Sequence, residues 1–208
     1  MCNLYRLNSK NAEIARMFEV REAASSNRSE EVYPGYPGLV VAGGFARTMN
    51  WGFPLIMTGK KGQKLKSKPV TNARDDKLHT PFWRQSFEQR RCLIPVTAWA
   101  EPEGASGQMT RTWYRLPECD IFAVAGLWRA SDEWGDVYTM VMVESSPRMQ
   151  EVHDRMPVIL APEHWHRWLT GTPREAFDLC RTWQGDLAPN RTDERWAGGP
   201  SLMGSLFG

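Results

Sequence analysis

Hydrophobic and polar positions alternate along the chain in short blocks, and these blocks predict a mixture of strands and helices. Runs of apolar residues predict buried strands at 39–42, 92–96, 121–125, 137–143 and 156–160. Apolar positions three and four apart, with their flanking caps, predict helices within 3–20 and at 76–91, 162–169 and 173–183. The segment 134–136 suits a hairpin connection between two of the strands.

These elements do not follow a regular strand–helix–strand alternation. The pattern is typical of an α+β domain with a mixed or antiparallel β-sheet, or a barrel, as its core and helices flanking it. A length of 208 residues indicates a single domain. We therefore assign residues 1–183 to the domain. We expect 184–208, which is rich in Gly, Pro and polar residues, to be an irregular tail.

Composition narrows the class of protein. Hydrophobic residues make up 41% and charged residues 24% of the chain, a globular balance that excludes a disordered or collagen-like protein. A net charge of +2 argues against bulk coating of a polyanion but leaves room for a local basic groove. Residues 60–68 carry five Lys, which we interpret as a solvated loop. No apolar stretch approaches 18 residues, so we predict no membrane partner, and we expect a monomer.

Cysteine and histidine spacing bears on compartment and metal binding. The four Cys are scattered without a C-x-x-C pair, as in a reduced cytoplasmic protein, and the N-terminus has no apolar segment typical of a signal peptide. His164 and His166 stand two apart at a predicted helix start, where their side chains diverge. We predict a cytoplasmic protein with no metal and no cofactor.

Cys2 carries the most distinctive chemistry in the chain. Removal of Met1 would make it the N-terminal residue, with a thiol two carbons from a free amine. That amine titrates at about 7.7–8.0 and is partly neutral at physiological pH. The amine can form a Schiff base with an aldehyde, and the thiol can then close a five-membered thiazolidine ring. Position alone favours a Cys without a function.

Such a site needs groups that move protons and hold the aldehyde. Asn72 lies in a Val-Thr-Asn-Ala-Arg segment, Glu101 follows an apolar run, and His153 precedes a predicted strand. Each also has a structural interpretation: a turn residue, a surface acid and a loop histidine, respectively.

Five motifs occur together in a fixed order: Cys2, the NAR triplet at 72–74, RRCLIP at 90–95 with Glu101 after it, AGLW at 125–128 and HDRMP at 153–157. Their order and spacing resemble the SOS-response-associated peptidase (SRAP) family over roughly residues 2–170.

The resemblance implies an abasic-site sensor that crosslinks to single-stranded DNA through a thiazolidine formed by Cys2, with autopeptidase or lyase-type chemistry. By position, Asn72 would orient the sugar or the amine, Glu101 would act as general acid and base, and His153 would assist ring opening and reversal. Arg74 and Arg155 would hold phosphates flanking the lesion. We add Arg91 and Trp51 to the expected DNA-binding face, the latter as a surface for stacking bases.

The chain departs from the family pattern in several places. It begins Met-Cys-Asn-Leu where the family usually has Met-Cys-Gly-Arg, which leaves Arg6 as the nearest basic residue. Glu101 lies in an Ala-Glu-Pro setting rather than between aromatic residues. The stretch from Gly52 to Asn72 is longer than expected and basic, so Leu65 or Phe53 would replace the family's base-stacking wedge.

Two other functions fit the same residues. One is an N-terminal-nucleophile cysteine peptidase or amidohydrolase, with Cys2 assisted by Glu101 or His153. The other is a nucleic-acid-binding module in which Cys2 has no chemical role.

Overall fold

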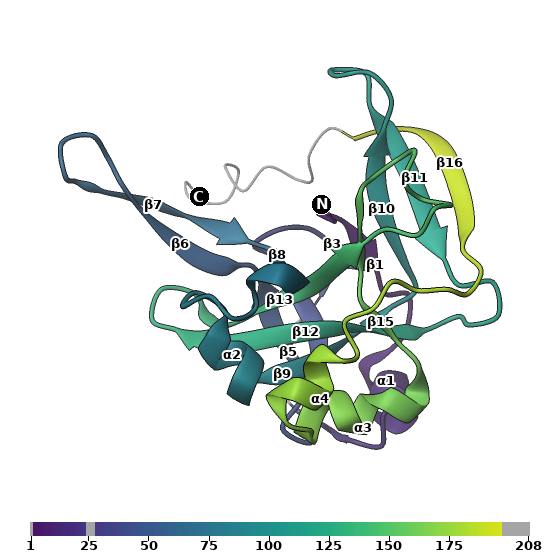
Figure 1. Ribbon diagram of the computed structural model, residues 1–208, viewed down its shortest axis with the longest axis horizontal. Helices are drawn as coiled ribbons and strands as arrows, with labels where there is room; N and C mark the ends of the chain where they lie inside the picture. The colour runs from purple at the N-terminus through teal and green to yellow at the C-terminus, as the bar shows by residue number, and fades with distance from the viewer. Residues whose placement is uncertain (1, 24–27, 197–208) are drawn as a thin grey trace.

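The computed structural model describes residues 2–23 and 28–196, which form one α+β domain of three sheets with short helices at their margins (Figure 1). This architecture confirms the predicted fold class. None of the helices in the described ranges has the length and apolar character needed to cross a bilayer.

The largest sheet is mixed and forms the core of the domain. Its main path runs in the order β14 (Arg155–Pro157), β13 (Gly135–Glu144), β12 (Phe122–Ser131), β9 (Arg91–Val96), β4 (Pro37–Ala42), β5 (Phe45–Trp51) and β2 (Arg21–Glu22). Two short strands join it, β15 (Ile159–Leu160) beside β12 and β8 (Asn72–Arg74) parallel to β13. The inner strands are buried along most of their length, which explains why they appear in the sequence as continuous apolar runs.

A second, antiparallel sheet carries the N-terminal strand. Its order is β16 (Ala188–Arg195), β11 (Thr110–Arg115), β10 (Ala98–Glu103), β1 (Tyr5–Arg6) and β3 (Glu31–Val32). The third sheet is a hairpin of β6 (Phe53–Thr58) and β7 (Lys64–Val70), which projects away from the body (Figure 1).

The helices are short and differ in part from the prediction. They are α1 (Asn11–Met17), α2 (Arg84–Gln89), α3 (Pro162–Thr170), α4 (Pro173–Phe177) and the 3-10 helix η1 (Asp75–Lys77). The helix expected over 76–91 is divided into η1 and α2, because Pro81 lacks an amide donor and disfavours a helical conformation at the residue before it. The second C-terminal helix ends at Phe177 rather than near residue 183.

The expected irregular tail contains a strand. Within 184–208, residues 188–195 form β16 and pair with β11, while 197–208 lie outside the described residues. The side chains of β16 are mostly exposed and polar, so the strand is held by backbone pairing at the edge of a sheet. Such pairing leaves no hydrophobic alternation in the sequence to reveal it.

Two tyrosines join the N-terminal strand to the large sheet. The hydroxyl groups of Tyr5 in β1 and Tyr138 in β13 are 2.5 Å apart, and both rings are fully buried. Tyr5 also meets the edge of Trp51, at 5.1 Å between ring centroids. Gly38 leaves space for this pair, since a Cβ there would lie 2.1 Å from the Tyr138 hydroxyl. The start of the chain is therefore anchored against the core sheet.

Arg91, expected on the DNA-binding face, is instead 7% exposed and lies in the interior. Its Nε donates to Trp168 O at 2.5 Å, and its Nη1 donates to Phe87 O at 2.6 Å. Its Nη2 donates to Gly171 O. These carbonyls include those at the C-terminal ends of α2 and α3, which need donors because the helices end there. Since its donors are engaged by the fold, we assign Arg91 a structural role and leave it out of the proposed DNA contacts.

We predict that Arg91→Ala lowers the free energy of unfolding by about 2–4 kcal/mol, because it leaves buried carbonyls without donors. Urea unfolding followed by tryptophan fluorescence measures this loss. The matched control is Arg84→Ala on the exposed face of α2, which should change stability by less than about 0.5 kcal/mol. Equal stability of the two variants would contradict the structural role of Arg91.

Candidate functional site

Cys2 lies at the junction between the two larger sheets. Its side chain has no exposed surface, and the thiol donates to Leu4 O at 3.6 Å. Burial raises the pKa of this thiol well above its ordinary value, and the nearby charge of Glu101 raises the pKa further. The thiol is therefore protonated in the folded protein at neutral pH, and its reaction needs a group that accepts the proton.

Asn72 connects the N-terminal segment to the large sheet. It begins β8, and its Nδ2 donates to Cys2 O and to Thr71 Oγ1, both at 2.8 Å. Thr71 Oγ1 in turn donates to Asn3 Oδ1 at 3.0 Å. Asn72 is 7% exposed, and its Oδ1 has no hydrogen-bond partner among the described residues. The Asn72 side chain thus holds the backbone of Cys2 and leaves one acceptor available.

Glu101 enters the site from β10. In the antiparallel pairing of β1 with β10, Tyr5 lies opposite Trp99, and the Ala100 amide donates to Leu4 O. Extending this register by one residue brings Glu101 beside the segment that carries Cys2. Glu101 has no exposed surface, and burial raises the pKa of its carboxyl group to about 8. The structure thus excludes the interpretation of Glu101 as a surface acid.

His153 lies in the loop between β13 and β14. Its Nδ1 accepts from the Arg155 amide at 3.0 Å and lies 3.2 Å from Asp154 Oδ1. Partial burial is the main cause that lowers the pKa of this imidazole, so the ring is neutral at pH 7. The charge of Asp154 raises the pKa of Glu101 as well, which indicates that this loop lies near Glu101.

The two arginines expected to bind phosphate flank β13. Arg74 ends β8 and forms an exposed, two-point ion pair with Asp76 at 2.8–2.9 Å. Arg155 begins β14 on the other side of β13, and its Nη1 lies 3.8 Å from Asp75 Oδ1. Arg74 is thus on the same strand as Asn72, and Arg155 follows His153 by two residues in the chain.

Trp51, expected near the DNA face, is fully buried instead. Its Nε1 donates to Thr71 O at 3.1 Å, and its ring stacks on Tyr138 at 6.4 Å between centroids. It offers no surface to a base. Its position shows that it acts through packing, because it fixes the backbone that presents Asn72.

A cavity of about 360 Å³ opens beside the N-terminal segment. Asn3, Leu4 and Thr71 form one part of its lining, and Arg111 and Trp196 form another. Thr71 was not predicted from the sequence, although its position beside Asn72 and its hydroxyl group could have indicated it. The cavity lies beside the residues that follow Cys2 in the chain, and Cys2 itself is not among its lining residues.

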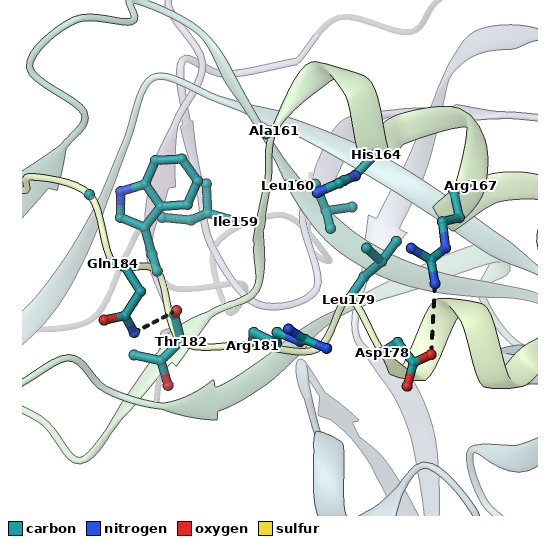
Figure 2. Close-up of a pocket in the computed structure, with 12 residues that line it drawn as sticks. Ile159, Leu160, Ala161, His164, Arg167, Asp178, Leu179, Arg181, Thr182 and Gln184 are labelled. Atoms are coloured by element: carbon teal, nitrogen blue, oxygen red, sulfur yellow. Dashed lines mark hydrogen bonds and ion pairs between the residues drawn. The ribbon is translucent and has the colours of Figure 1, made fainter.

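A larger cavity of about 590 Å³ lies by α3 and the segment that follows α4 (Figure 2). Figure 2 shows His164 and Arg167 extending from α3 toward it, with Arg167 3.7 Å from Asp178. The residues predicted to act with Cys2 line neither its walls nor its mouth in the described structure. We therefore place the candidate site at Cys2 rather than in the larger cavity.

Metal binding has no visible basis in this part of the molecule. Within residues 2–23 and 28–196, no group of three or more His, Cys, Asp or Glu side chains is arranged to hold a metal ion. What the site does contain is a buried thiol, a carboxyl group that is neutral at pH 7, a neutral imidazole and a buried amide. That combination suits proton transfer around a nucleophile.

Comparison with known proteins indicates a family. The family model described as SOS response associated peptidase (SRAP) matches residues 1–192, further along the chain than the motifs in the sequence alone indicated. Among characterised relatives, the abasic site processing protein YoqW of Bacillus subtilis is 32% identical over 127 residues. YobE of the same organism, with the same description, is 30% identical over 130 residues. These matches cover 58% of this chain, and 55% and 57% of the respective relatives.

Solved structures share the fold. A protein from Bacteroides thetaiotaomicron superimposes with a TM-score of 0.76 and 17% identity, covering 91% of each chain. A protein from Bordetella bronchiseptica gives a TM-score of 0.75 at 23% identity and covers 92% of this chain and 99% of its own. At these identities the likeness concerns the fold alone.

The raised pKa of Glu101 predicts a pH-dependent stability. Its carboxyl pKa is about 8 when folded and about 4.5 when exposed, so between these values the folded state binds more protons. Stability therefore falls as pH rises through this window. Glu101→Gln removes this titrating group. The free energy of unfolding of the variant minus that of the wild type should therefore increase from pH 5 to pH 8, by at most about 1.4 kcal/mol per pH unit.

Urea unfolding at pH 5, 6, 7 and 8 measures this difference. Glu103→Gln is the matched control, because Glu103 lies on the same strand and its pKa is lowered by hydrogen bonding to Thr112. Its difference from wild type should not grow over the same range. A constant difference for Glu101→Gln would contradict the assignment of a neutral carboxyl group at pH 7.

Proposed function

The chain belongs to the SOS response associated peptidase (SRAP) family, and from this premise we propose that it recognises abasic sites in single-stranded DNA and bonds to them through Cys2. The observation that carries the proposal is the burial of Glu101 beside Cys2, with Asn72 bound to the Cys2 carbonyl. The description of the relatives as abasic site processing proteins supports the substrate class.

The proposed reaction begins with removal of Met1, which frees the amine of Cys2. That amine attacks the aldehyde carbon of the ring-opened abasic sugar, and loss of one water gives a Schiff base. The thiol sulfur then adds to the imine carbon while a proton passes to the nitrogen, which closes the thiazolidine. One water leaves overall, and no oxidant or reductant is required.

Glu101 and His153 divide the proton transfers. Glu101 is protonated at pH 7, so it can donate to the ring oxygen as the sugar opens. The attacking amine then returns a proton to the carboxylate as it bonds to the aldehyde carbon, and Glu101 donates that proton to the departing hydroxyl group. The resulting carboxylate can then accept the thiol proton. Neutral His153 can take the proton of the sugar hydroxyl during ring opening and return it during reversal. The two side chains thus begin the reaction in the protonation states that these roles need.

Positioning falls to the amide and the arginines. Asn72 holds the Cys2 backbone, and its free Oδ1 can accept a hydrogen bond from the amine or the sugar. Arg74 and Arg155 hold the phosphates on either side of the lesion. The ion pair of Arg74 with Asp76 is solvent-exposed, and such pairs contribute little stability, so a phosphate can compete for Arg74.

A peptidase or amidohydrolase is the second candidate, because the same nucleophile and proton donors could attack an amide carbonyl. Cys2 has no exposed surface and lies beside a cavity of about 360 Å³. We favour the aldehyde reaction because it uses both the thiol and the amine of Cys2.

We predict that the protein, with Met1 removed, forms a heat-resistant adduct with single-stranded DNA containing one abasic site, without borohydride reduction. Denaturing gels detect the adduct. Its mass should equal that of protein plus DNA minus one water. Cys2→Ala and a form that retains Met1 should give no adduct, whereas Cys180→Ala, which removes a thiol far along the chain, should react like wild type.

The controls separate the candidate functions. DNA without an abasic site should give no adduct, since it offers no aldehyde. Absence of an adduct with the wild-type protein, together with Cys2-dependent cleavage of a peptide, would favour the peptidase. Salt-sensitive binding that is the same in Cys2→Ala, without either reaction, would favour a simple binding module.

His153→Gln should still allow the adduct to form but slow its formation or its reversal by about 10²–10⁴-fold, the usual contribution of proton transfer. Time courses in both directions, measured with gel-purified adduct for the reversal, determine the rates. Glu151→Gln is the matched control, because this exposed residue lies in the same loop and its change leaves His153 and Asp154 in place. Unchanged rates in both directions for His153→Gln would remove His153 from the site.

A further inference from the structure

The hairpin of β6 and β7 extends from the body as a two-stranded sheet of its own (Figure 1). Its base is fixed by Phe53, which is fully buried and packs against Trp83 at 5.2 Å between ring centroids. Beyond that base its side chains are largely exposed. An exposed ribbon of this kind adds little to the hydrophobic core, so packing does not account for its residues.

The hairpin carries charge of one sign. Residues 53–70 contain five Lys and no Asp or Glu. Strand alternation sets Lys64, Lys66 and Lys68 on one face of β7. The opposite face includes Ser67, which is 4% exposed and donates to Glu133 Oε2 at 2.8 Å. The body of the protein therefore takes the Ser67 face, and the three lysines point to solvent.

Positive charge continues at the base of the hairpin. The Arg129 guanidinium lies 4.3 Å from the centre of the Phe53 ring, and its Nη2 donates to Pro54 O at 3.3 Å. Burial lowers the pKa of Arg129, and the like charge of Arg90 lowers it further. The two guanidinium groups repel each other, and an anion bound beside them would relieve that repulsion.

The exposed apolar side chains limit how a ligand is held. Leu55, Ile56 and Leu65 are 42%, 63% and 40% exposed, so the hairpin combines aliphatic and cationic side chains. Its aromatic residue, Phe53, is buried and offers no stacking surface. Such a surface suits an anionic polymer gripped by its phosphates, with sugar or base edges resting on the aliphatic groups.

The hairpin is joined directly to the reactive site. The last residue of β7 is Val70, and Thr71 and Asn72 follow it without a linker. A strand of DNA with its lesion at Cys2 would therefore extend past the hairpin within a few nucleotides.

We propose that the β6–β7 hairpin is a DNA-binding arm, whose lysine face grips the backbone phosphates of the strand flanking the reactive nucleotide. This proposal rests on the proposed function for the identity of the polymer. The arm supplies the non-covalent, salt-dependent part of recognition, and the site at Cys2 supplies the covalent part. Local charge on the arm is thus compatible with a net charge of only +2.

The test measures equilibrium binding to fluorescent single-stranded DNA without an abasic site, from 50 mM to 500 mM salt. The test variant carries Lys64→Gln, Lys66→Gln and Lys68→Gln. Its log–log slope of affinity against salt should be less steep by about 2, since each phosphate contact on a single strand contributes about 0.7. At 0.1 M salt the affinity should fall roughly 100-fold, and the two fitted lines should meet when extrapolated to about 1 M.

The matched control removes three exposed cations from the helical end of the molecule, as Arg16→Gln, Arg174→Gln and Arg181→Gln. It has the same net charge as the test variant and should keep the wild-type slope to within about 0.5. Ile56→Ser should weaken binding at every salt concentration without changing the slope. Equal slopes for both triple variants would overturn the arm and leave only a general charge effect.

Two further outcomes are informative. If light scattering shows that the lysine variant self-associates while its DNA binding is unchanged, the lysines protect the strand edges from pairing and the proposal fails. Intact DNA has no aldehyde, so this binding does not depend on adduct formation. Wild-type protein that binds through the lysines but forms no adduct overturns the proposed function alone. Adduct formation with unaltered slopes overturns the arm alone.

Discussion

Exclusion of water from Cys2 and Glu101 is the constraint on which the proposed chemistry depends. Neither side chain has exposed surface, and burial raises the pKa of both groups. A carboxyl group in water would be ionised at pH 7 and would make a poor acid. At this junction between sheets the Glu101 carboxyl group keeps its proton. The partly buried imidazole of His153 is neutral and can accept a proton. One physical effect, desolvation, thus prepares a donor and an acceptor from two ordinary side chains.

The framework that excludes water is built from segments distant in the chain. Tyr5 and Tyr138 join the N-terminal strand to the large sheet, and Trp51 Nε1 donates a hydrogen bond to the Thr71 carbonyl. Asn72 then bonds to the backbone of Cys2. These contacts come from β1, β5, β8 and β13, and Cys2 has its place only when all four strands are assembled. The burial of large aromatic side chains at this junction is therefore part of the site's geometry.

The charged side chains lie around the enclosed site rather than inside it. The enclosed site is poor in charge at neutral pH, since its acid and its histidine are neutral. The cations lie around it, in the β6–β7 hairpin and in Arg74 and Arg155 at the ends of β8 and β14. Long-range attraction of a polyanion requires exposed charge, whereas bond formation at Cys2 benefits from a dry, neutral pocket. The fold keeps these two requirements apart.

The sequence by itself determined the α+β class, the apolar core strands and the set of residues around Cys2, because hydrophobic runs and short motifs are local properties. It also indicated Asn72, Glu101 and His153 as a group through their resemblance to a family. Only the tertiary structure decided which side chains are buried. Trp51 and Arg91, which were predicted at the DNA-binding face, lie in the interior. Residues 188–195, which were predicted to be irregular, form β16. Burial, edge pairing and pKa depend on contacts between residues far apart in the chain, and local patterns carry no record of them.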